Sequence, residues 1–116
     1  MKKLVTHNPQ WLMKGDQRVG LIFTCPTRPD EQQTCFFAKT PRNEQIEAIR
    51  SLVGNMQDDD EPDLSHIQLC DEDCGWTCSP PVAEATFENI SIQPSLDGSK
   101  GGNWHGFITN GECDAC

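Results

Sequence analysis

Seven cysteines in 116 residues are the feature that most constrains how this chain can fold. Three of them are spaced four residues apart in the stretch LCDEDCGWTC at residues 69–78, among acidic side chains and next to a Gly-Trp pair. A small domain with a modest core gains a large share of its stability from metal ions or disulfides that crosslink its loops. The cysteines therefore predict how the chain is held together more directly than what it does.

The cysteine spacing predicts a structural zinc site. Zinc usually takes four Cys or His ligands as two local pairs, because a tight turn can place two thiolates at tetrahedral spacing. Cys113 and Cys116 have the C-x2-C spacing, and Cys70 and Cys74 have the C-x3-C spacing. These four residues together form one candidate four-cysteine site.

Other candidate ligands lie outside this set. Cys25 and Cys35 are placed to meet across the two arms of a hairpin. His105 is a further candidate, although a hydrogen-bonded histidine of a strand explains it equally well. Cys78 forms another C-x3-C half-site with Cys74.

The start of the chain favours metal over disulfides. Thr6, His7, Asn8 and Pro9 interrupt any apolar region of a signal peptide, and no stretch approaches the roughly 18 apolar residues of a membrane span. We therefore expect an unexported protein in the cytoplasm of a bacterial host cell or in a virion. Clustered cysteines bind metal more often than they form disulfides in a reducing cytosol. Two alternatives stay open, namely disulfides formed in an oxidising setting and free cysteines buried as small apolar side chains.

The net charge of −9 constrains the choice of partner. Binding to a phosphate backbone needs a basic surface, which 18 acidic and 9 basic residues do not favour, so nucleic acid is an unfavoured partner. The acidity serves solubility or offers an acidic face to a basic protein surface. The acidic runs at 58–63 and 71–73 are the candidate contacts for such a partner. The oligomeric state is not predicted.

Hydrophobic periodicity predicts one helix over residues 41–56. Thr40 is the expected cap, Pro41 suits the first helical position, and an apolar stripe repeats at helical spacing. That stripe comprises Ile46, Ile49, Val53 and Met56.

Alternating patterns and turn residues predict several short strands. A hairpin is expected over residues 11–25 with its turn at Lys14-Gly15-Asp16, and a loop over 26–33 leads to a strand at 34–39. Further strands are expected at 66–70, 85–93 and 103–113, where Glu88, Ile90 and Ile92 share one face of the second and His105, Phe107 and Thr109 one face of the third. Asn110-Gly111 is a favoured type I′ turn pair. We predict a single α+β domain over residues 1–116, with a small antiparallel sheet, one amphipathic helix and a stabilising zinc.

Catalytic motifs are missing from the sequence. It contains no H-E-x-x-H, no Walker A loop and no G-x-S-x-G, nor the H-x-E and P-C-x-x-C pair of a zinc deaminase. Cys74 or Cys78 with His105 can be drawn as a nucleophile and base, but sequence alone does not bring them together. Whether the protein is an enzyme stays open, and the balance favours a protein without catalytic activity.

Four short motifs in order carry a resemblance to a known family. They are FTCP at 23–26, GWT at 75–77, ATFENISI at 85–92 and WHGFITNGE at 104–112. In this order the chain resembles the DUF6527 family, small cysteine- and histidine-containing proteins of unknown function from bacteria and tailed phages. The chain departs from the family pattern where Trp104 replaces the cysteine before His105. The match covers about half of the chain.

The resemblance implies its own set of metal ligands. By analogy with the family, Cys25, His105 and either Cys113 or Cys116 would share a metal, and Cys35 would replace the missing partner of Cys25. This set competes with the four cysteines chosen from spacing, and two metal ions would satisfy both.

These observations lead to one functional hypothesis and two alternatives. The leading hypothesis is an acidic, non-catalytic protein-interaction module with structural zinc, encoded by a phage and acting in the virion or against a host protein. The alternatives are a small zinc-dependent enzyme and a disulfide-stapled structural protein of the virion.

The zinc hypothesis predicts the mass of the purified protein. Native mass spectrometry of reduced and untreated samples should show one or two zinc ions with all seven thiols recoverable. Removal of the metal should unfold the protein, because binding at such sites is largely folding free energy. A metal-free sample that is lighter by about two hydrogens for each blocked pair of thiols would indicate disulfides instead.

Overall fold

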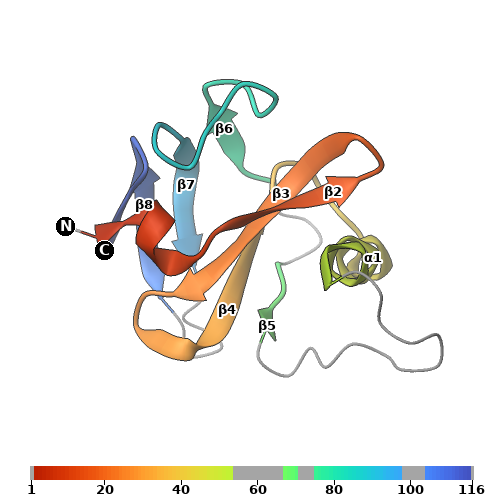
Figure 1. Ribbon diagram of the computed structural model, residues 1–116, viewed down its shortest axis with the longest axis horizontal. Helices are drawn as coiled ribbons and strands as arrows, with labels where there is room; N and C mark the ends of the chain where they lie inside the picture. The colour runs from red at the N-terminus through yellow and green to blue at the C-terminus, as the bar shows by residue number, and fades with distance from the viewer. Residues whose placement is uncertain (1, 54–66, 71–74, 98–103, 116) are drawn as a thin grey trace.

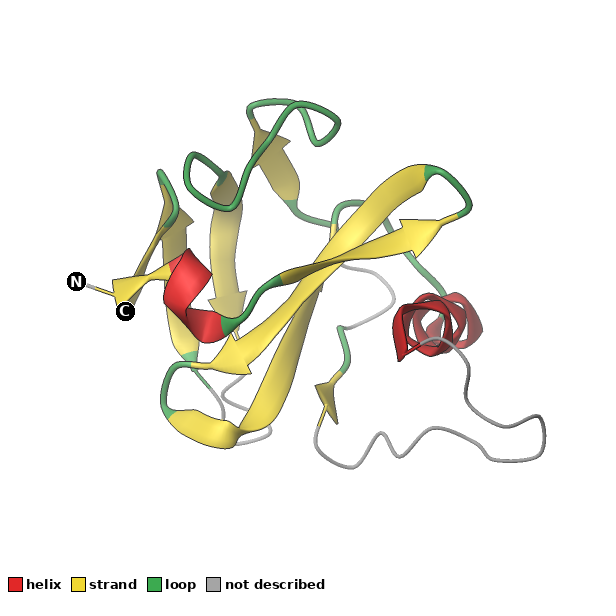
Figure 2. Cartoon of the chain, viewed as in Figure 1, coloured by secondary structure: helices red, strands yellow, loops and turns green. Residues whose placement is uncertain are grey.

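The computed structural model describes residues 2–53, 67–70, 75–97 and 104–115 (Figure 1). The described part of the chain forms two small, mainly antiparallel sheets and one α-helix, which confirms the α+β class (Figure 2). In chain order the elements are β1 (Lys2–Lys3), the 3-10 helix η1 (Leu4–His7), β2 (Gln10–Lys14), β3 (Gln17–Cys25), β4 (Arg28–Phe36), α1 (Arg42–Val53), β5 (Ile67–Gln68), β6 (Thr77–Ser79), β7 (Ser91–Asp97), β8 (His105–Thr109) and β9 (Glu112–Ala115).

The two sheets and the helix form three layers. One sheet has the strand order β2-β3-β4-β5 and is here named the central sheet; only its β4–β5 pair is parallel. The other has the order β1-β9-β8-β7-β6, is antiparallel throughout, and is named the outer sheet. The helix α1 packs on one face of the central sheet and the outer sheet on the other, with β8 and α1 at opposite ends of the molecule (Figure 1).

Strand β3 lies inside both cores because it is covered on both faces. Side chains of a strand alternate between its faces. Leu21, Phe23 and Cys25 face the core between the sheets, whereas Ile22 faces the helix. Because both faces of β3 are buried, its apolar residues follow one another and do not alternate with polar ones.

Most buried apolar side chains belong to one of two cores. The core between the sheets consists of Leu4, Leu21, Phe23, Cys25, Cys35, Ala85, Ile90, Ile92, Leu96, Trp104, Ile108 and Cys113. The core beneath the helix consists of Leu12, Ile22, Phe36, Ala48 and Ile49.

Both predicted hairpin turns are confirmed. Gly15 has φ +62° in the two-residue turn between β2 and β3, where Lys14 pairs with Gln17. Asn110 and Gly111 have φ +49° and +75° in the turn between β8 and β9, as the type I′ turn requires.

The predicted loop at 26–33 was wrong. Pro26 and Thr27 make a two-residue turn, and β4 begins at Arg28. The polar side chains that suggested a loop include Gln33, which is only 3% exposed. Gln33 is satisfied there because its amide donates to the carbonyl oxygen of Trp104 (3.1 Å) and accepts from the N–H of Trp104 (3.0 Å).

The predicted strand at 85–93 was partly wrong, since β7 begins at Ser91. Residues 82–84 and 87–89 form turns instead. The side chain of Asn89 accepts from the N–H of Thr86 (2.8 Å), which closes the second turn. Ala85 and Ile90 are buried on either side of this turn. The apolar residues that suggested a strand therefore hold a loop against the core.

The first residue of the helix and its buried face differ from the prediction. It begins at Arg42, and the Thr40 hydroxyl donates to the carbonyl oxygen of Ala38 (2.7 Å), so the cap expected at Thr40 was wrong. Within residues 42–52 of the helix, Gln45, Ala48 and Ile49 are buried, whereas Ile46 is half-buried. Met56 and the predicted helix end lie outside the described residues.

No described helix is long and apolar enough to span a bilayer.

The β8–β9 turn packs closely against the backbone of Phe87 and Glu88. Substitution of its glycine should therefore destabilise the protein more than substitution of the glycine in the β2–β3 turn. A Cβ at Gly111 would lie 2.5 Å from the carbonyl oxygen of Glu88, whereas a Cβ at Gly15 meets nothing within 4 Å. Gly15→Ala should lower the free energy of unfolding by about 1 kcal/mol, because alanine is strained in the left-handed backbone conformation. Gly111→Ala should lower it by about 3 kcal/mol, because a steric clash is added to that strain. Urea unfolding of both variants measures the difference. Equal losses would contradict this reading of the turn.

Candidate functional site

The structure describes five of the seven cysteines, all as free thiols. They are Cys25, Cys35, Cys70, Cys78 and Cys113. The other two predicted metal ligands, Cys74 and Cys116, lie outside the described residues.

Cys70 is anchored between the central sheet and the helix. Its thiol donates to the carbonyl oxygen of Thr34 on β4 (3.1 Å). Gln45 of α1, which is 1% exposed, donates to the carbonyl oxygens of Thr40 (2.9 Å) and Cys70 (3.1 Å) and accepts from the Cys70 N–H (3.1 Å). These bonds fix the start of the cysteine-rich segment against α1.

The four-cysteine site predicted from spacing needs two segments that the structure holds apart. Cys113 lies on β9, opposite Ile108 of β8 and Lys2 of β1. Cys70 follows β5 and contacts β4 and α1. Strand β8, which pairs with β9, and α1 lie at opposite ends of the molecule (Figure 1). Cys70 and Cys113 are therefore not placed as ligands of one metal.

The predicted pair of Cys25 and Cys35 is not formed across the hairpin. Cys35 pairs with Leu21, which lies four residues before Cys25 on β3, whereas Cys25 pairs with Arg28. At about 3.3 Å per residue, the two cysteines are separated by roughly 13 Å along the strands. The Cys25 thiol lies 3.4 Å from the hydroxyl of Thr27 instead.

The metal set implied by the family resemblance is divided by the outer sheet. His105 lies on the exposed face of β8, whose burial alternates between exposed and buried residues. Cys113 is 7% exposed and belongs to the core on the other face, as does Cys25. His105 therefore cannot share a metal with Cys113 or Cys25 in this arrangement. Within residues 2–53, 67–70, 75–97 and 104–115, no three His, Cys, Asp or Glu side chains are placed to hold one ion.

Among the described cysteines, Cys70 and Cys78 are near enough to Cys35 to affect its pKa, although Cys70 packs on the helix side of the central sheet and Cys35 on the other side. Burial raises the pKa of Cys35 well above its ordinary value, and the nearby Cys70 and Cys78 raise it further. Burial also raises the pKa of Cys78, against the opposing charge of Arg18. The spacing of Cys78 offered it as a half-site with Cys74, which lies outside the described residues.

The outer face of the outer sheet is exposed. Phe107 on β8 is 44% exposed there, and its side chain lies between His105 and Thr109, which are exposed on the same face. Asp114 pairs with Phe107 across the hairpin, and Glu112 pairs with Thr109. A large aromatic side chain and two carboxylates thus share this surface.

A shallow hollow of about 480 Å³ lies beside Phe107. It crosses β6, β7 and β8, and polar side chains such as Thr77, Gln93 and Thr109 line it. The hollow has no buried titratable group among its lining residues. The lining of the hollow offers one aromatic side chain for contact and no titratable side chain.

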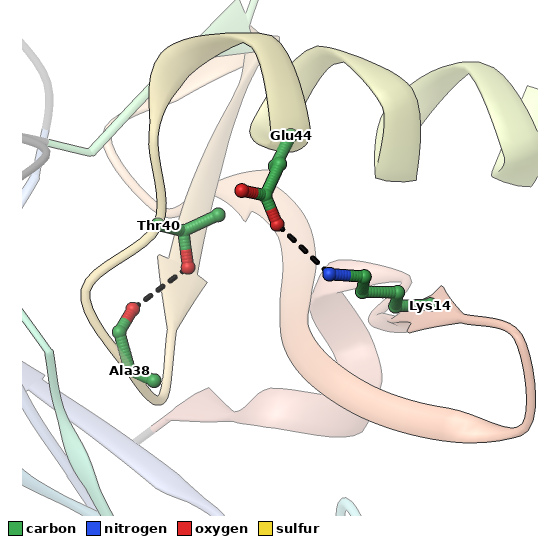
Figure 3. Close-up of polar contacts among 4 residues, drawn as sticks. All are labelled: Lys14, Ala38, Thr40 and Glu44. Atoms are coloured by element: carbon green, nitrogen blue, oxygen red, sulfur yellow. Dashed lines mark hydrogen bonds and ion pairs between the residues drawn. The ribbon is translucent and has the colours of Figure 1, made fainter.

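A second concavity, of about 630 Å³, lies between α1 and the β2–β3 hairpin. We name it the hairpin–helix groove. The Lys14 ammonium on the hairpin pairs with the Glu44 carboxylate on the helix (3.0 Å), which spans the two walls (Figure 3). The Thr40 hydroxyl donates to the Ala38 carbonyl oxygen in the segment between β4 and α1, which also lines the groove (Figure 3).

The groove was missed from the sequence, although the charge distribution carries a signal for it. Residues 1–53 hold eight of the nine basic residues and five of the eighteen acidic ones. Lys14, Arg18 and Lys39 of that basic set line the groove. The overall charge of −9 conceals this local excess of positive charge.

Comparisons with known protein families, curated proteins and solved structures found no match. The resemblance to the DUF6527 family therefore stays a hypothesis.

The burial of the thiols predicts their order of reaction with iodoacetamide at pH 8. Cys25, Cys35 and Cys113 are buried, and burial together with Asp114 raises the pKa of Cys113 to about 11. At pH 8 such a thiol is ionised in only about one molecule in a thousand. We expect these three to react at least about tenfold more slowly than Cys78, whose side chain is partly exposed.

Peptide mass spectrometry of samples quenched at successive times measures this order. A sample in urea, where every thiol should react, serves as the control. Labelling of Cys35 at the rate of Cys78 would contradict the described packing of β4.

Proposed function

We propose that this protein is a non-catalytic interaction module that binds a protein partner with a basic surface through the outer face of its outer sheet. The single observation that carries the proposal is Phe107, exposed to 44% on that face. Aromatic side chains in this position often supply a large part of the binding energy of an interface.

The surroundings of Phe107 support a protein interface. The hollow beside it is shallow and lined by uncharged polar side chains, as at the rim of many interfaces. The backbone under this face is a regular ladder of β7, β8 and β9. A rigid sheet loses little conformational entropy on binding, which favours affinity.

Charge supports a basic partner. Residues 75–97 and 104–115, which form all of the outer sheet except β1, contain five acidic residues and neither Lys nor Arg. Glu112 and Asp114 lie on the same face as Phe107. Complementary charge speeds association and selects among partners. The acidic runs at 58–63 and 71–73, expected to take part, lie outside the described residues.

Structural zinc remains part of the proposal. Because Cys70 and Cys113 belong to different segments of the fold, two separate metal sites are more compatible with the geometry than one shared site. The metal would then stabilise the fold and take no part in binding the partner. The phage origin and the choice between a virion component and an antagonist of a host protein rest on the resemblance alone.

Two serine substitutions with nearly equal exposure test the interface. Phe107 and Val5 are 44% and 42% exposed, and Val5 lies on η1, away from the hollow. Partners captured by the wild-type protein from bacterial lysate would be identified, purified and titrated against each variant by calorimetry. Phe107→Ser should weaken binding about thirtyfold, and Val5→Ser should leave it unchanged.

Salt provides a second readout on the same purified pair. Because the interface is proposed to join opposite charges, the affinity should fall as ionic strength rises. A partner that binds Phe107→Ser as tightly as the wild type, or whose own surface is acidic, would sink the proposal.

A further inference from the structure

Phe107 and Asp114 lie directly opposite each other on β8 and β9. Directly opposite residues of an antiparallel pair point to the same face of the sheet, and their Cβ atoms are about 5 Å apart. The adjacent residues Ile108 and Cys113 belong to the core between the sheets, so Phe107 and Asp114 point outward. An exposed aromatic ring and a carboxylate are therefore neighbours on this face, and we name them the Phe107–Asp114 pair.

The charge around the Phe107–Asp114 pair suits a single cation. Asp114 forms no ion pair within the described part of the chain. Glu112 lies on the same face opposite Lys3 of β1, whose ammonium offsets its charge. With His105 counted as neutral, Lys3, Glu112 and Asp114 together leave one negative charge on this part of the face.

An aromatic ring beside a carboxylate favours arginine over lysine. A cation over the face of a ring is attracted by the negative charge of the π-system. The planar guanidinium of arginine stacks on the ring while its N–H groups point at the carboxylate, so both contacts form at once. The ammonium of lysine is compact and strongly hydrated, and it has no plane to lay on the ring.

The chain itself contains an arginine that combines these two kinds of contact. The Arg18 guanidinium lies 4.3 Å from the ring centre of Trp11. Its Nη1 donates at the same time to the carbonyl oxygens of Val82 and Ala85 (both 3.0 Å). Stacking on an aromatic ring thus leaves the N–H groups of a guanidinium available to oxygen acceptors beside that ring.

The hollow beside Phe107 suits the backbone that carries such an arginine. It lies on the β7 side of Phe107, whereas Asp114 lies on the β9 side. The side chains of Thr77, Gln93 and Thr109 line it and can both donate and accept hydrogen bonds. An extended segment that crosses β8 would place its arginine at the Phe107–Asp114 pair and its backbone over the hollow.

We propose that the outer face of the outer sheet recognises an arginine side chain of its partner. The guanidinium stacks on the ring of Phe107 and donates to the carboxylate of Asp114. This inference rests on the proposed function, because it assigns the chemistry of the basic partner at the same surface. It adds a discrimination between two side chains of equal charge, which a merely acidic surface would not make.

Three peptides of equal length test this discrimination by amide chemical shifts in NMR at physiological ionic strength. They are acetylated and amidated trimers of the dipeptides Gly-Arg, Gly-Lys and Gly-citrulline. The arginine peptide should give saturable shifts at Gln93, Phe107 and Asp114, with a Kd on the order of 1 mM. The lysine peptide should bind at least about threefold more weakly, because it loses the stacking. The citrulline peptide, which is planar but neutral, should bind about tenfold more weakly.

Three variants locate the recognition at the Phe107–Asp114 pair. Phe107→Leu keeps an apolar side chain and removes the ring, so the arginine and lysine peptides should bind with nearly equal Kd. Asp114→Asn should raise the Kd of the arginine peptide about threefold or more. Asp16→Asn changes the net charge equally, but Asp16 lies in the β2–β3 turn of the central sheet, so the Kd should stay unchanged.

Several outcomes would overturn this inference. They are equal binding of the arginine and lysine peptides to the wild type, shifts confined to residues away from the outer sheet, and a preference for arginine that persists in Phe107→Leu. A Kd that Asp16→Asn raises as much as Asp114→Asn would overturn it as well. Each variant is compared only where its spectrum shows the native fold.

Failure of the arginine inference and failure of the proposed function give different results. If the peptides show no preference but Phe107→Ser still weakens binding of the protein partner, the interface stands and only the arginine assignment fails. If Phe107→Ser leaves the protein partner bound as tightly as the wild type, the interface itself is wrong.

Discussion

The burial of β3 on both faces is the constraint on which the rest of the structure depends. Its alternate residues are divided between two cores, with Phe23 in the core between the sheets and Ile22 in the core beneath the helix. A shift of one residue in register would exchange the two sets. Tight turns at both ends of β3, at Gly15-Asp16 and Pro26-Thr27, hold the register that keeps both cores filled.

Two buried glutamine side chains form hydrogen bonds to the backbone of distant residues. Gln33 bonds to both backbone groups of Trp104, and Gln45 bonds to both backbone groups of Cys70. Each side-chain amide supplies the donor and acceptor that a neighbouring strand would offer. Because both amides are buried, loss of either would leave unsatisfied backbone groups away from water. Gln33 thus ties the central sheet to Trp104, the residue before β8, and Gln45 ties α1 to Cys70 at the start of the cysteine-rich segment.

Local features of this fold could be predicted from the sequence, and pairings between distant residues could not. The Asn110-Gly111 turn depends on two residues and was correct. The first part of β4, residues 28–33, was taken for a loop because it is rich in turn and polar residues. The burial of Gln33 within it is explained by a distant partner, Trp104. Spacing likewise identifies short cysteine pairs but not which strands lie together, so Cys35 was matched with Cys25 rather than with the segment that carries Cys70 and Cys78.

The order of the layers carries most of the division of charge along the sequence across the molecule, the exception being Lys2 and Lys3 of β1, which lie at the edge of the outer sheet beside β9. The basic residues of 1–53 belong mainly to the central sheet and α1, whereas residues 75–97 and 104–115 of the outer layer have no Lys or Arg. Charge separated in this way orients a charged partner before contact, because the field reaches about a Debye length from the surface. Under the proposed function, this field would direct a basic protein to the sheet that carries Phe107. The net charge of −9 describes neither surface alone.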